Sequence, residues 1–242
     1  MEFIEIPLNR LAMKKKLVIS TGAGISAESG ISTFRDSGGL WDKYPVMEVA
    51  SAEGFARNPA LVHEFYNTRR KELLAVEPND AHRGLVALEE KYDVQIITQN
   101  VDNLHERAGS SNVLHLHGEL MKVRSMKVES RVYELTPDNL ETSIDSRDKY
   151  GDAVRPHIVF FNEAVPNIEP AIEMVQQADI FVVIGTSLNV YPAAGLLRYV
   201  RPGAEVYYID PNPASVPSGV EVLPMIASKG VKKLIEILDE KN

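Results

Sequence analysis

Short apolar runs recur along the chain, and stretches with apolar residues at helical spacing separate several of them. The runs span residues 16–20, 94–98, 157–161, 180–184 and 206–209. Runs of this length predict buried strands. Apolar positions at helical spacing predict helices over residues 170–178, 192–200 and 231–238. Strands that alternate with helices indicate an α/β fold in which a mainly parallel sheet carries helices on both faces.

A glycine-containing turn follows the first predicted strand. It reads Thr21-Gly22-Ala23-Gly24-Ile25-Ser26-Ala27. Gly22 and Gly24 allow a tight turn and let a pyrophosphate approach the backbone, and a helix that begins near Ile25 would point its positive end at that group. The G-x-G-x-x-A spacing directly after a strand is typical of Rossmann-like nucleotide-binding domains.

The region that follows differs from that of an ordinary dehydrogenase. In a dehydrogenase, a second strand should end in an acidic residue about 20 residues later, but residues 33–41 are typical of a loop. An acidic residue, Asp210, instead ends the late run at 206–209. Asp210 could hold ribose hydroxyls from there, or it could be a turn residue within the Asp-Pro-Asn-Pro sequence that it begins. The sequence leaves both readings open.

Two segments interrupt the alternation of strands and helices. Residues 33–59 hold aromatic, glycine and polar residues without periodicity, and we interpret them as a loop with short helices that covers the nucleotide. Residues 122–154 are polar and highly charged, with short strand-like pieces such as 130–135, and indicate a small inserted module. We expect one unit of 242 residues. Its large Rossmann-like part would take residues 1–32, 80–118 and 155–242, and its insertions residues 33–79 and 119–154.

Composition narrows the classes of function. With 26 basic and 34 acidic residues, the net charge is -8, so a broad basic surface for nucleic acid is not expected. The chain is 44% hydrophobic and 25% charged, which suffices for a full globular core. It has no cysteine, which excludes disulfides, thiolate catalysis and a cysteine-ligated zinc site.

Membrane and export signals are not expected either. No apolar run approaches the roughly 20 residues that span a bilayer. Residues 1–16 alternate apolar and charged positions and hold no signal-peptide core. The expected location is therefore cytoplasmic.

Three further polar segments stand at predicted strand ends, at residues 98–105, 116–119 and 185–188. Open α/β sheets bind ligands at the carboxyl ends of their strands, so these segments could converge. Together with the glycine turn, they resemble the sirtuins, the NAD-dependent protein deacylases. The matching motifs are 22–26, 30–31, 34–35, 98–102, 117–118, 155–163 and 185–187. They follow the family's order over residues 17 to 230, and such an ordered combination is specific.

The resemblance implies an enzyme that consumes NAD to remove acyl groups from protein lysines. The residues implied to line the NAD site are Gly22, Ala23, Gly24, Ile25, Phe34, Arg35, Gln99, Gly185, Thr186 and Ser187. Gln99 would hold the nicotinamide-side ribose, while Asn212 and Ala227 would lie near the adenosine end. Residues 159–163 would pair with the backbone of the acylated peptide as an added strand, through Val159, Phe161, Asn162 and Glu163.

The resemblance also implies the catalytic residues. His117 would be the general base, and Asn100 and Asp102 would shape the nicotinamide pocket. In the sirtuin mechanism, the acyl oxygen attacks the ribose carbon as nicotinamide leaves. The base then helps to deprotonate a ribose hydroxyl, and the acyl group ends on ADP-ribose. Histidine suits this task because its ordinary pKa of about 6.5 lets it accept a proton near neutral pH.

Residue types alone leave other readings of His117 open. On a strand, His115 and His117 would project to the same side and could form part of a metal site. No cysteine is available and the spacing shows no third ligand, so no metal is expected. Without the resemblance, His117 would be interpreted as a packed or surface histidine.

The chain departs from the family at several positions. Most sirtuins carry four zinc-binding cysteines after the His-Gly pair, whereas residues 119–154 have none, and Ser125 and Val128 stand at the spacing of the first pair. We expect a zinc-free module held by packing alone. Ser32-Thr33 replaces the usual Pro-Asp, Asn162 replaces a glycine, and Asp210 replaces an asparagine.

A Tyr-x-x-Arg pattern bears on the identity of the acyl group. Tyr66 and Arg69 would share one face of a helix, and an arginine together with a tyrosine hydroxyl can bind a carboxylate. The pair resembles that of sirtuins that prefer succinyl- and malonyl-lysine, and Ala50 matches the small residue that enlarges such a pocket. We therefore predict a preference for acidic acyl groups over acetyl. The alternative is a surface helix with Tyr66 half-buried and Arg69 in solvent.

Other functions would use the same nucleotide site. The chain could be a protein ADP-ribosyltransferase, or a non-catalytic sensor of NAD or ADP-ribose. His117 and the peptide-binding segment 155–163 favour deacylation over transfer. The set of Asn100, Asp102 and His117 exceeds what nucleotide binding alone requires. A redox dehydrogenase is disfavoured because no hydride-acceptor pocket is evident.

Overall fold

The computed structural model describes residues 14–32 and 44–241. Its centre is a six-stranded sheet in the order β3-β2-β1-β7-β8-β9, in which every neighbouring pair is parallel. The strands are β1 (Lys16–Thr21), β2 (Asp93–Thr98), β3 (Val113–His115), β7 (Ile180–Ile184), β8 (Glu205–Ile209) and β9 (Val220–Leu223). The strands predicted at 16–20, 94–98, 180–184 and 206–209 are confirmed. The short β3 and β9 were not predicted.

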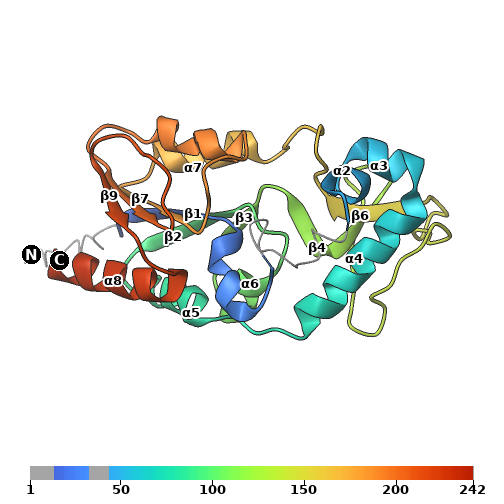
Figure 1. Cartoon of the computed structure of the whole chain (residues 1–242), viewed down its shortest axis with the longest axis horizontal. Coiled ribbons are helices and arrows are strands. Elements are labelled where there is room, and N and C mark those ends of the chain that lie inside the picture. The colour runs from blue at the N-terminus through green and yellow to red at the C-terminus, as the bar shows by residue number, and fades with distance from the viewer. Residues whose placement is uncertain (1–13, 33–43, 242) are drawn as a thin grey trace, which may run out of the picture.

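Helices cover both faces of this sheet (Figure 1). On one face, α5 (Asp80–Leu88) and α8 (Ala227–Glu240) enclose a core that includes Leu17. On the other face, α7 (Ile168–Gln176) and the 3-10 helix η3 (Ala193–Tyr199) pack over a core that includes Val18. Successive side chains of a strand point to opposite faces, so a sheet covered on both sides needs strands that are apolar throughout. The predicted α/β architecture is confirmed.

No helix within residues 14–32 and 44–241 is both long enough and apolar enough to cross a bilayer.

A smaller antiparallel sheet lies at one end of the large one (Figure 1). It joins β5 (Val132–Glu134), β4 (Gly118–Ser125) and β6 (Val154–Ile158), with β4 in the middle. The helices α2 (Val46–Val49), α3 (Ala52–Arg57) and α4 (Pro59–Leu74) pack beside it. A separate apolar cluster unites these helices with the sheet, through residues such as Phe65 of α4 and Leu120 of β4.

The prediction for residues 157–161 is wrong about the sheet to which they belong. The run is as apolar as the strands of the parallel sheet, but β6 pairs antiparallel with β4 and ends at Ile158. Beyond its end, Val159 N–H still donates to the carbonyl oxygen of His117, the residue before β4, at 2.9 Å. Periodicity reports burial and not the partner strand, so it could not separate the two sheets. The boundary predicted at residue 155 consequently falls inside β6.

Charged contacts hold the long connection between β4 and β6. Arg131 pairs with Asp148 at 3.1 Å and also with Asp152. The hydroxyl oxygen of Ser125, at the spacing of the first family cysteine, accepts the backbone N–H of Val128 at 3.3 Å. The expectation that packing alone holds this module is therefore wrong, because ion pairs and side-chain hydrogen bonds contribute.

Candidate active site

The order of the strands reverses next to β1, and this creates a crevice. The chain runs from β1 to β2 on one side and later returns to β7 on the other. Ligands of open α/β sheets bind at such a switch point, beyond the carboxyl ends of the strands. There Gly24 N–H donates to the carbonyl oxygen of Gly185 at 2.8 Å. A Cβ at position 24 would lie 2.6 Å from Gly185 Cα, so the two turns can touch only because neither carries a side chain.

The predicted helix beginning near Ile25 is wrong. Two short 3-10 turns stand there instead, η1 (Ala23–Ile25) and η2 (Ala27–Ser29). Ile25 N–H donates to the carbonyl oxygen of Gly22 at 3.1 Å, which is the tighter i to i+3 pattern. Gly30 ends the second turn with a φ of 96°. Turns this short have little dipole, so any anion here would be bound by individual N–H groups and side chains.

Polar residues from the strand ends meet beside these turns. Asn100 and Asp102 follow β2 and are buried. Asn100 Nδ2 donates to Ser26 Oγ at 3.1 Å, and Ser26 Oγ donates to Asp102 Oδ2 at 3.0 Å. Gln99 Nε2 reaches Thr186 Oγ1 of the turn after β7 at 3.4 Å. Ser26, which received no role from the sequence, thus links the glycine turn to Asn100 and Asp102.

The Asp102 carboxylate lies where ionisation is disfavoured. Burial raises its pKa, although hydrogen bonds from Leu104 N–H and the Ser26 hydroxyl act in the opposite direction. The Leu104 contact measures 3.1 Å. Both carboxylate oxygens accept a hydrogen bond within the protein, and this fixes the orientation of the Asp102 side chain.

His117 is held in one tautomer. Its Nδ1 lies 3.0 Å from the carbonyl oxygen of Gln99. Since a carbonyl oxygen only accepts, Nδ1 carries the hydrogen and donates, and the lone pair is left on Nε2. Burial lowers the pKa of His117, and the Gln99 contact only partly opposes this. The ring is therefore neutral near pH 7 and can accept a proton at Nε2.

His115 differs from His117 in its partners. Its Nδ1 lies 3.0 Å from the carbonyl oxygen of Asn100, and its Nε2 lies 2.8 Å from a carboxylate oxygen of Glu106. Both partners accept, so both ring nitrogens donate when the ring is an imidazolium. Burial acts to lower the pKa of His115, but the Glu106 contact outweighs it and the pKa is raised. A ring with both nitrogens engaged is no metal ligand, and His115 instead fixes the backbone of Asn100.

We expect the Glu106–His115 pair to stabilise the fold most at mildly acidic pH. The His115 contribution is complete below its unfolded pKa of 6.5 and is lost as the pH rises through its raised folded pKa. Glu106→Gln should lower the free energy of unfolding by about 1 kcal/mol near pH 6 and by less near pH 9, a value that allows for the partial exposure of Glu106. Urea unfolding measures this, with the exposed Glu90→Gln as control. A loss that is equal at both pH values would contradict the charged pair.

The predicted acyl-selective pair lies on α4. Tyr66 is buried, with its ring centroid 5.1 Å from that of Phe65 and 6.1 Å from that of Phe160. Burial raises the pKa of Tyr66, while the charge of Arg69 acts to lower it. Burial lowers the pKa of Arg69, and the negative charge of Asp102 is one of the groups that oppose this. Arg69 is half-buried, and its guanidinium carbon lies 5.9 Å from the centroid of the Phe65 ring.

The predicted peptide-binding segment is fixed from within. Phe161 N–H donates to the carbonyl oxygen of Ala50 at 2.8 Å. The Glu163 carboxylate turns back to accept Arg155 Nη1 at 2.6 Å and the N–H of Phe160 at 2.8 Å. Asn162 has a φ of 71°, and asparagine tolerates this left-handed conformation better than most residues. This explains how it can stand where the family has glycine.

The remaining predicted residues lie around the end of β8 and the start of α8. Asp210 is buried. Its Oδ1 accepts Asn212 N–H at 2.8 Å, a hydrogen bond typical of an aspartate in a turn. Asn212 is exposed, and Ala227 is the buried first residue of α8. Phe34 and Arg35 lie outside the described residues.

Known proteins resemble this chain over nearly its whole length. An NAD-dependent protein deacylase of Bacteroides thetaiotaomicron is 58% identical over 229 residues, which cover 93% of this chain and 98% of that protein. A Sir2 homologue solved with NAD superposes with a TM-score of 0.82 at 36% identity, covering 94% of this chain and 91% of that one. A Sir2 protein solved with a deacetylated p53 peptide and 3′-O-acetyl-ADP-ribose superposes with a TM-score of 0.77 at 31% identity, covering 93% and 94%.

The family is also recognised from the sequence motifs. Residues 22–192 match the family described as the Sir2 family. This span begins at the glycine turn and includes His117 and the segment after β6, so it contains the residues that meet at the crevice. The resemblance to sirtuins is confirmed at the level of the family, and the chain belongs to the Sir2 family.

Proposed function

We propose that this chain removes acyl groups from protein lysines at the expense of NAD. The observation that carries the proposal is the state of His117, whose Nδ1 is bound to Gln99 and whose Nε2 can accept a proton. It stands near the crevice where the turns after β1 and β7 meet. The name of the Bacteroides relative and the acetylated ADP-ribose bound to a solved relative support the same reaction.

The turns after β1 and β7 are the proposed site for NAD. Positions 22 and 24 have no room for a side chain, which fits a backbone that a pyrophosphate approaches closely. The proposed phosphate and adenine-ribose contacts are Gly22, Ala23, Gly24, Ile25, Gly185, Thr186 and Ser187, with Asp210, Asn212 and Ala227 toward the adenosine. Gln99 would hold the nicotinamide-side ribose. Phe34 and Arg35, which lie outside the described residues, would line the NAD site on the strength of the family resemblance alone.

His117 would move the proton that acyl transfer requires. Nicotinamide is released, one water is consumed, and the acyl group passes from the lysine nitrogen to a ribose hydroxyl of the resulting ADP-ribose, which leaves free lysine. The Nε2 of His117 accepts the proton of that hydroxyl as it attacks the acyl carbon. Asn100 and Asp102, positioned through Ser26, would shape the nicotinamide pocket.

The acylated peptide would lie along residues 159–163. The N–H groups of Val159 and Phe161 are already bonded within the protein, so a peptide strand would pair with the carbonyl groups of this segment. Because Val159 bonds to the backbone of His117, a docked peptide would lie beside the base. Glu163 supports this arrangement by holding the segment to Arg155 rather than by contacting the peptide itself.

A mass-resolved assay tests the proposed reaction. The purified chain is incubated with NAD and matched acetyl-, succinyl- and unmodified lysine peptides, and both nicotinamide and peptide masses are followed. We expect the acyl mass to be lost only when NAD is present. ADP-ribose added to the peptide would instead establish a transferase. NAD binding without either change would establish a sensor.

The acyl preference is proposed to be acidic. Tyr66 and Arg69 lie on the same face of α4, and Arg69 is close enough to Asp102 for their charges to interact. A succinyl or malonyl carboxylate could ion-pair with Arg69 and accept the Tyr66 hydroxyl, whereas an acetyl group would satisfy neither. Ala50 would leave room beside them.

Replacing Arg69 with methionine should separate the two activities. We expect Arg69→Met to cut kcat/KM for succinyl-lysine about 10- to 100-fold, because a carboxylate would lose its charged partner, and to change kcat/KM for acetyl-lysine by less than about threefold. The measurement is mass-resolved kinetics with both peptides. Arg57→Met, on α3, is the control. Equal losses with both peptides would contradict a carboxylate-binding Arg69.

A further inference from the structure

Two arginines stand opposite each other in the smaller sheet. Arg124 of β4 pairs in register with Arg155 of β6, and like charges directly opposite one another are unfavourable. A single carboxylate, that of Glu163, lies between them. Arg155 takes both of its oxygens, at 2.6 and 3.0 Å, whereas Arg124 reaches one of them at 3.5 Å. Two positive charges thus share one negative charge.

Arg124 makes the weaker contact of the two with Glu163. Its side chain is only 9% exposed, and the 3.5 Å contact to Glu163 is the one hydrogen bond that its guanidinium makes within the described part of the chain. A guanidinium offers several N–H donors in one plane, and a buried charge is costly unless it is paired. Burial and the charge of Arg155 lower the pKa of Arg124, while the charges of Glu163 and Glu129 oppose this. The position favours an additional anion.

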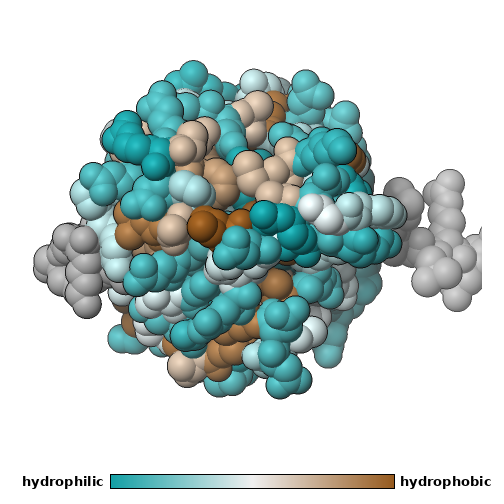
Figure 2. Space-filling view, turned by 90° about the vertical axis from the view of Figure 1, so that its right-hand side faces the viewer, coloured by the Kyte–Doolittle hydropathy of each residue, from teal (hydrophilic) through white to brown (hydrophobic). Residues whose placement is uncertain are grey.

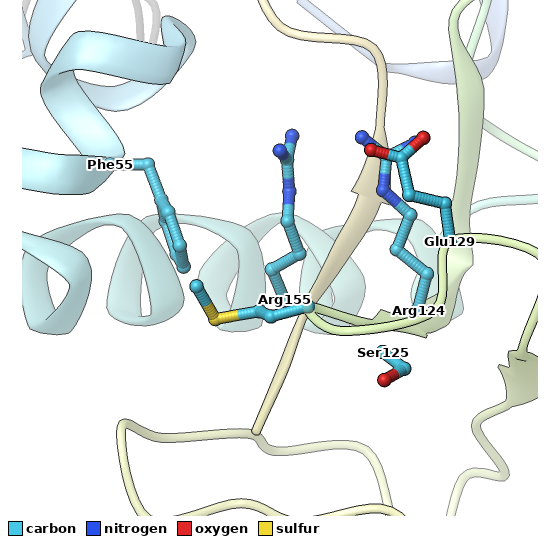
Figure 3. Close-up of a pocket in the computed structure, with 6 residues that line it drawn as sticks. Phe55, Arg124, Ser125, Glu129 and Arg155 are labelled. Atoms are coloured by element: carbon cyan, nitrogen blue, oxygen red, sulfur yellow. The ribbon is translucent and has the colours of Figure 1, made fainter. Parts of the chain in front are cut away.

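A hollow adjoins Arg124 at this end of the molecule. It is lined by Phe55, Arg124, Ser125, Met126, Glu129 and Arg155 and has about 320 Å³ of empty space, its open mouth included. Figure 3 shows the side chains of Arg155 and Arg124 standing side by side, with Phe55 on one flank and Glu129 next to Arg124. Met126 is 54% exposed. Figure 2 shows this end of the molecule as mostly hydrophilic, with hydrophobic groups interspersed. The hollow therefore combines a cationic floor with an apolar wall.

We propose that this hollow is a binding site for a small organic carboxylate. The carboxylate would ion-pair with Arg124, and its apolar body would lie against Phe55 and Met126. The apolar wall and the single available guanidinium favour an organic acid over a phosphate, which usually gathers more donors. Glu129 competes with the ligand from the rim. Of the lining residues, only Arg155 also supports the proposed peptide-binding segment, through Glu163. Binding of the acid can be measured without NAD or an acylated peptide, so this proposal does not depend on the proposed reaction.

Calorimetric titration of the full chain with 3-phenylpropionate tests the site without an activity assay. We expect saturable binding of the acid and none of the matched 3-phenylpropanamide, because the amide cannot ion-pair. Inorganic phosphate should bind more weakly than the acid. An acidic peptide is titrated in the same way. Tighter binding of the peptide than of 3-phenylpropionate would identify a protein side chain as the source of the carboxylate, and weaker binding would identify a free acid.

Two variants should shift the affinity in opposite directions. Arg124→Gln should weaken binding at least about tenfold, which corresponds to the loss of one charged hydrogen-bonded contact. Glu129→Gln should strengthen it about threefold or more, because the competing carboxylate is gone, and its exposed position leaves the fold intact even if Arg124→Gln destabilises it. Equal binding of acid and amide, no binding to either the unaltered chain or Glu129→Gln, or tighter binding of phosphate would overturn the proposal.

Discussion

Replacing His117 with alanine is expected to lower kcat/KM for NAD-dependent deacylation by about 10²- to 10⁴-fold, the usual contribution of a positioned general base. The reason is geometric, because Nε2 is the only ring nitrogen with a lone pair once Nδ1 donates to Gln99. Nicotinamide release coupled to peptide mass measures the loss. His157→Ala, on β6 outside the proposed site, is the control, and activity of His117→Ala within threefold of the parent, an allowance for indirect effects, would contradict the role of base.

The pH dependence of kcat/KM of the unaltered chain is a second test of His117 as the base. Burial lowers the pKa of His117 from the ordinary value of 6.5. The base becomes competent as the pH rises through this lowered pKa, so the acidic limb of kcat/KM should be centred below pH 6.5. A limb centred above pH 6.5 would show that another group governs the reaction.

Gly185→Ala is expected to produce the second large effect. Gly185 has a φ of 63°, and a Cβ there would lie 2.5 Å from Ile25 N and 2.6 Å from Gly24 C. The left-handed backbone and the clash together should cost about 2–5 kcal/mol of the free energy of unfolding. The turns after β1 and β7 must also separate, so NAD affinity should fall at least about tenfold. Urea unfolding and calorimetric titration with NAD measure the two losses.

Gly203→Ala is a matched control for this substitution. Gly203 also has a positive φ, of 87°, but nothing lies within 4 Å of the Cβ that alanine would add. Gly203→Ala should lower the free energy of unfolding by about 1–2 kcal/mol, the cost of a left-handed backbone for alanine. NAD affinity should be unchanged. Equal losses of stability and NAD affinity in the two variants would show that the contact between the two turns is not the reason for glycine at position 185.

The large sheet could be predicted from the sequence because its strands are buried on both faces. Unbroken apolar runs such as 180–184 follow from that burial, and the polar ends of the same runs marked the crevice. The three residues of β3 were too few to give a pattern. Residues 157–161 were assigned to the wrong sheet, because apolar character reports burial and not which strand is the neighbour.

The proposed site was only partly predictable for a similar reason. His117 could be singled out by its motif, but its tautomer depends on a carbonyl oxygen 18 positions away in the chain. The charge of His115 depends on Glu106, which lies on α6 (Leu104–Ala108). Ser26 gains its importance only because Asn100 and Asp102 fold against it. Motifs identify residue types, whereas protonation and hydrogen-bond direction are set by partners that folding brings together.

The ion pairs of the β4–β6 connection hold this part of the protein without any thiol that an oxidant could attack. With no cysteine in the chain, peroxides and thiol-modifying reagents have no sulfhydryl target there. Arg131, Asp148 and Asp152 cannot be oxidised or chelated as a zinc–thiolate centre can. The connection is sensitive to acid instead, because protonation of both aspartates would break its ion pairs with Arg131. A zinc–thiolate module would be sensitive to oxidation as well as to acid, because its thiolates must stay deprotonated, whereas these ion pairs offer no thiol to oxidise.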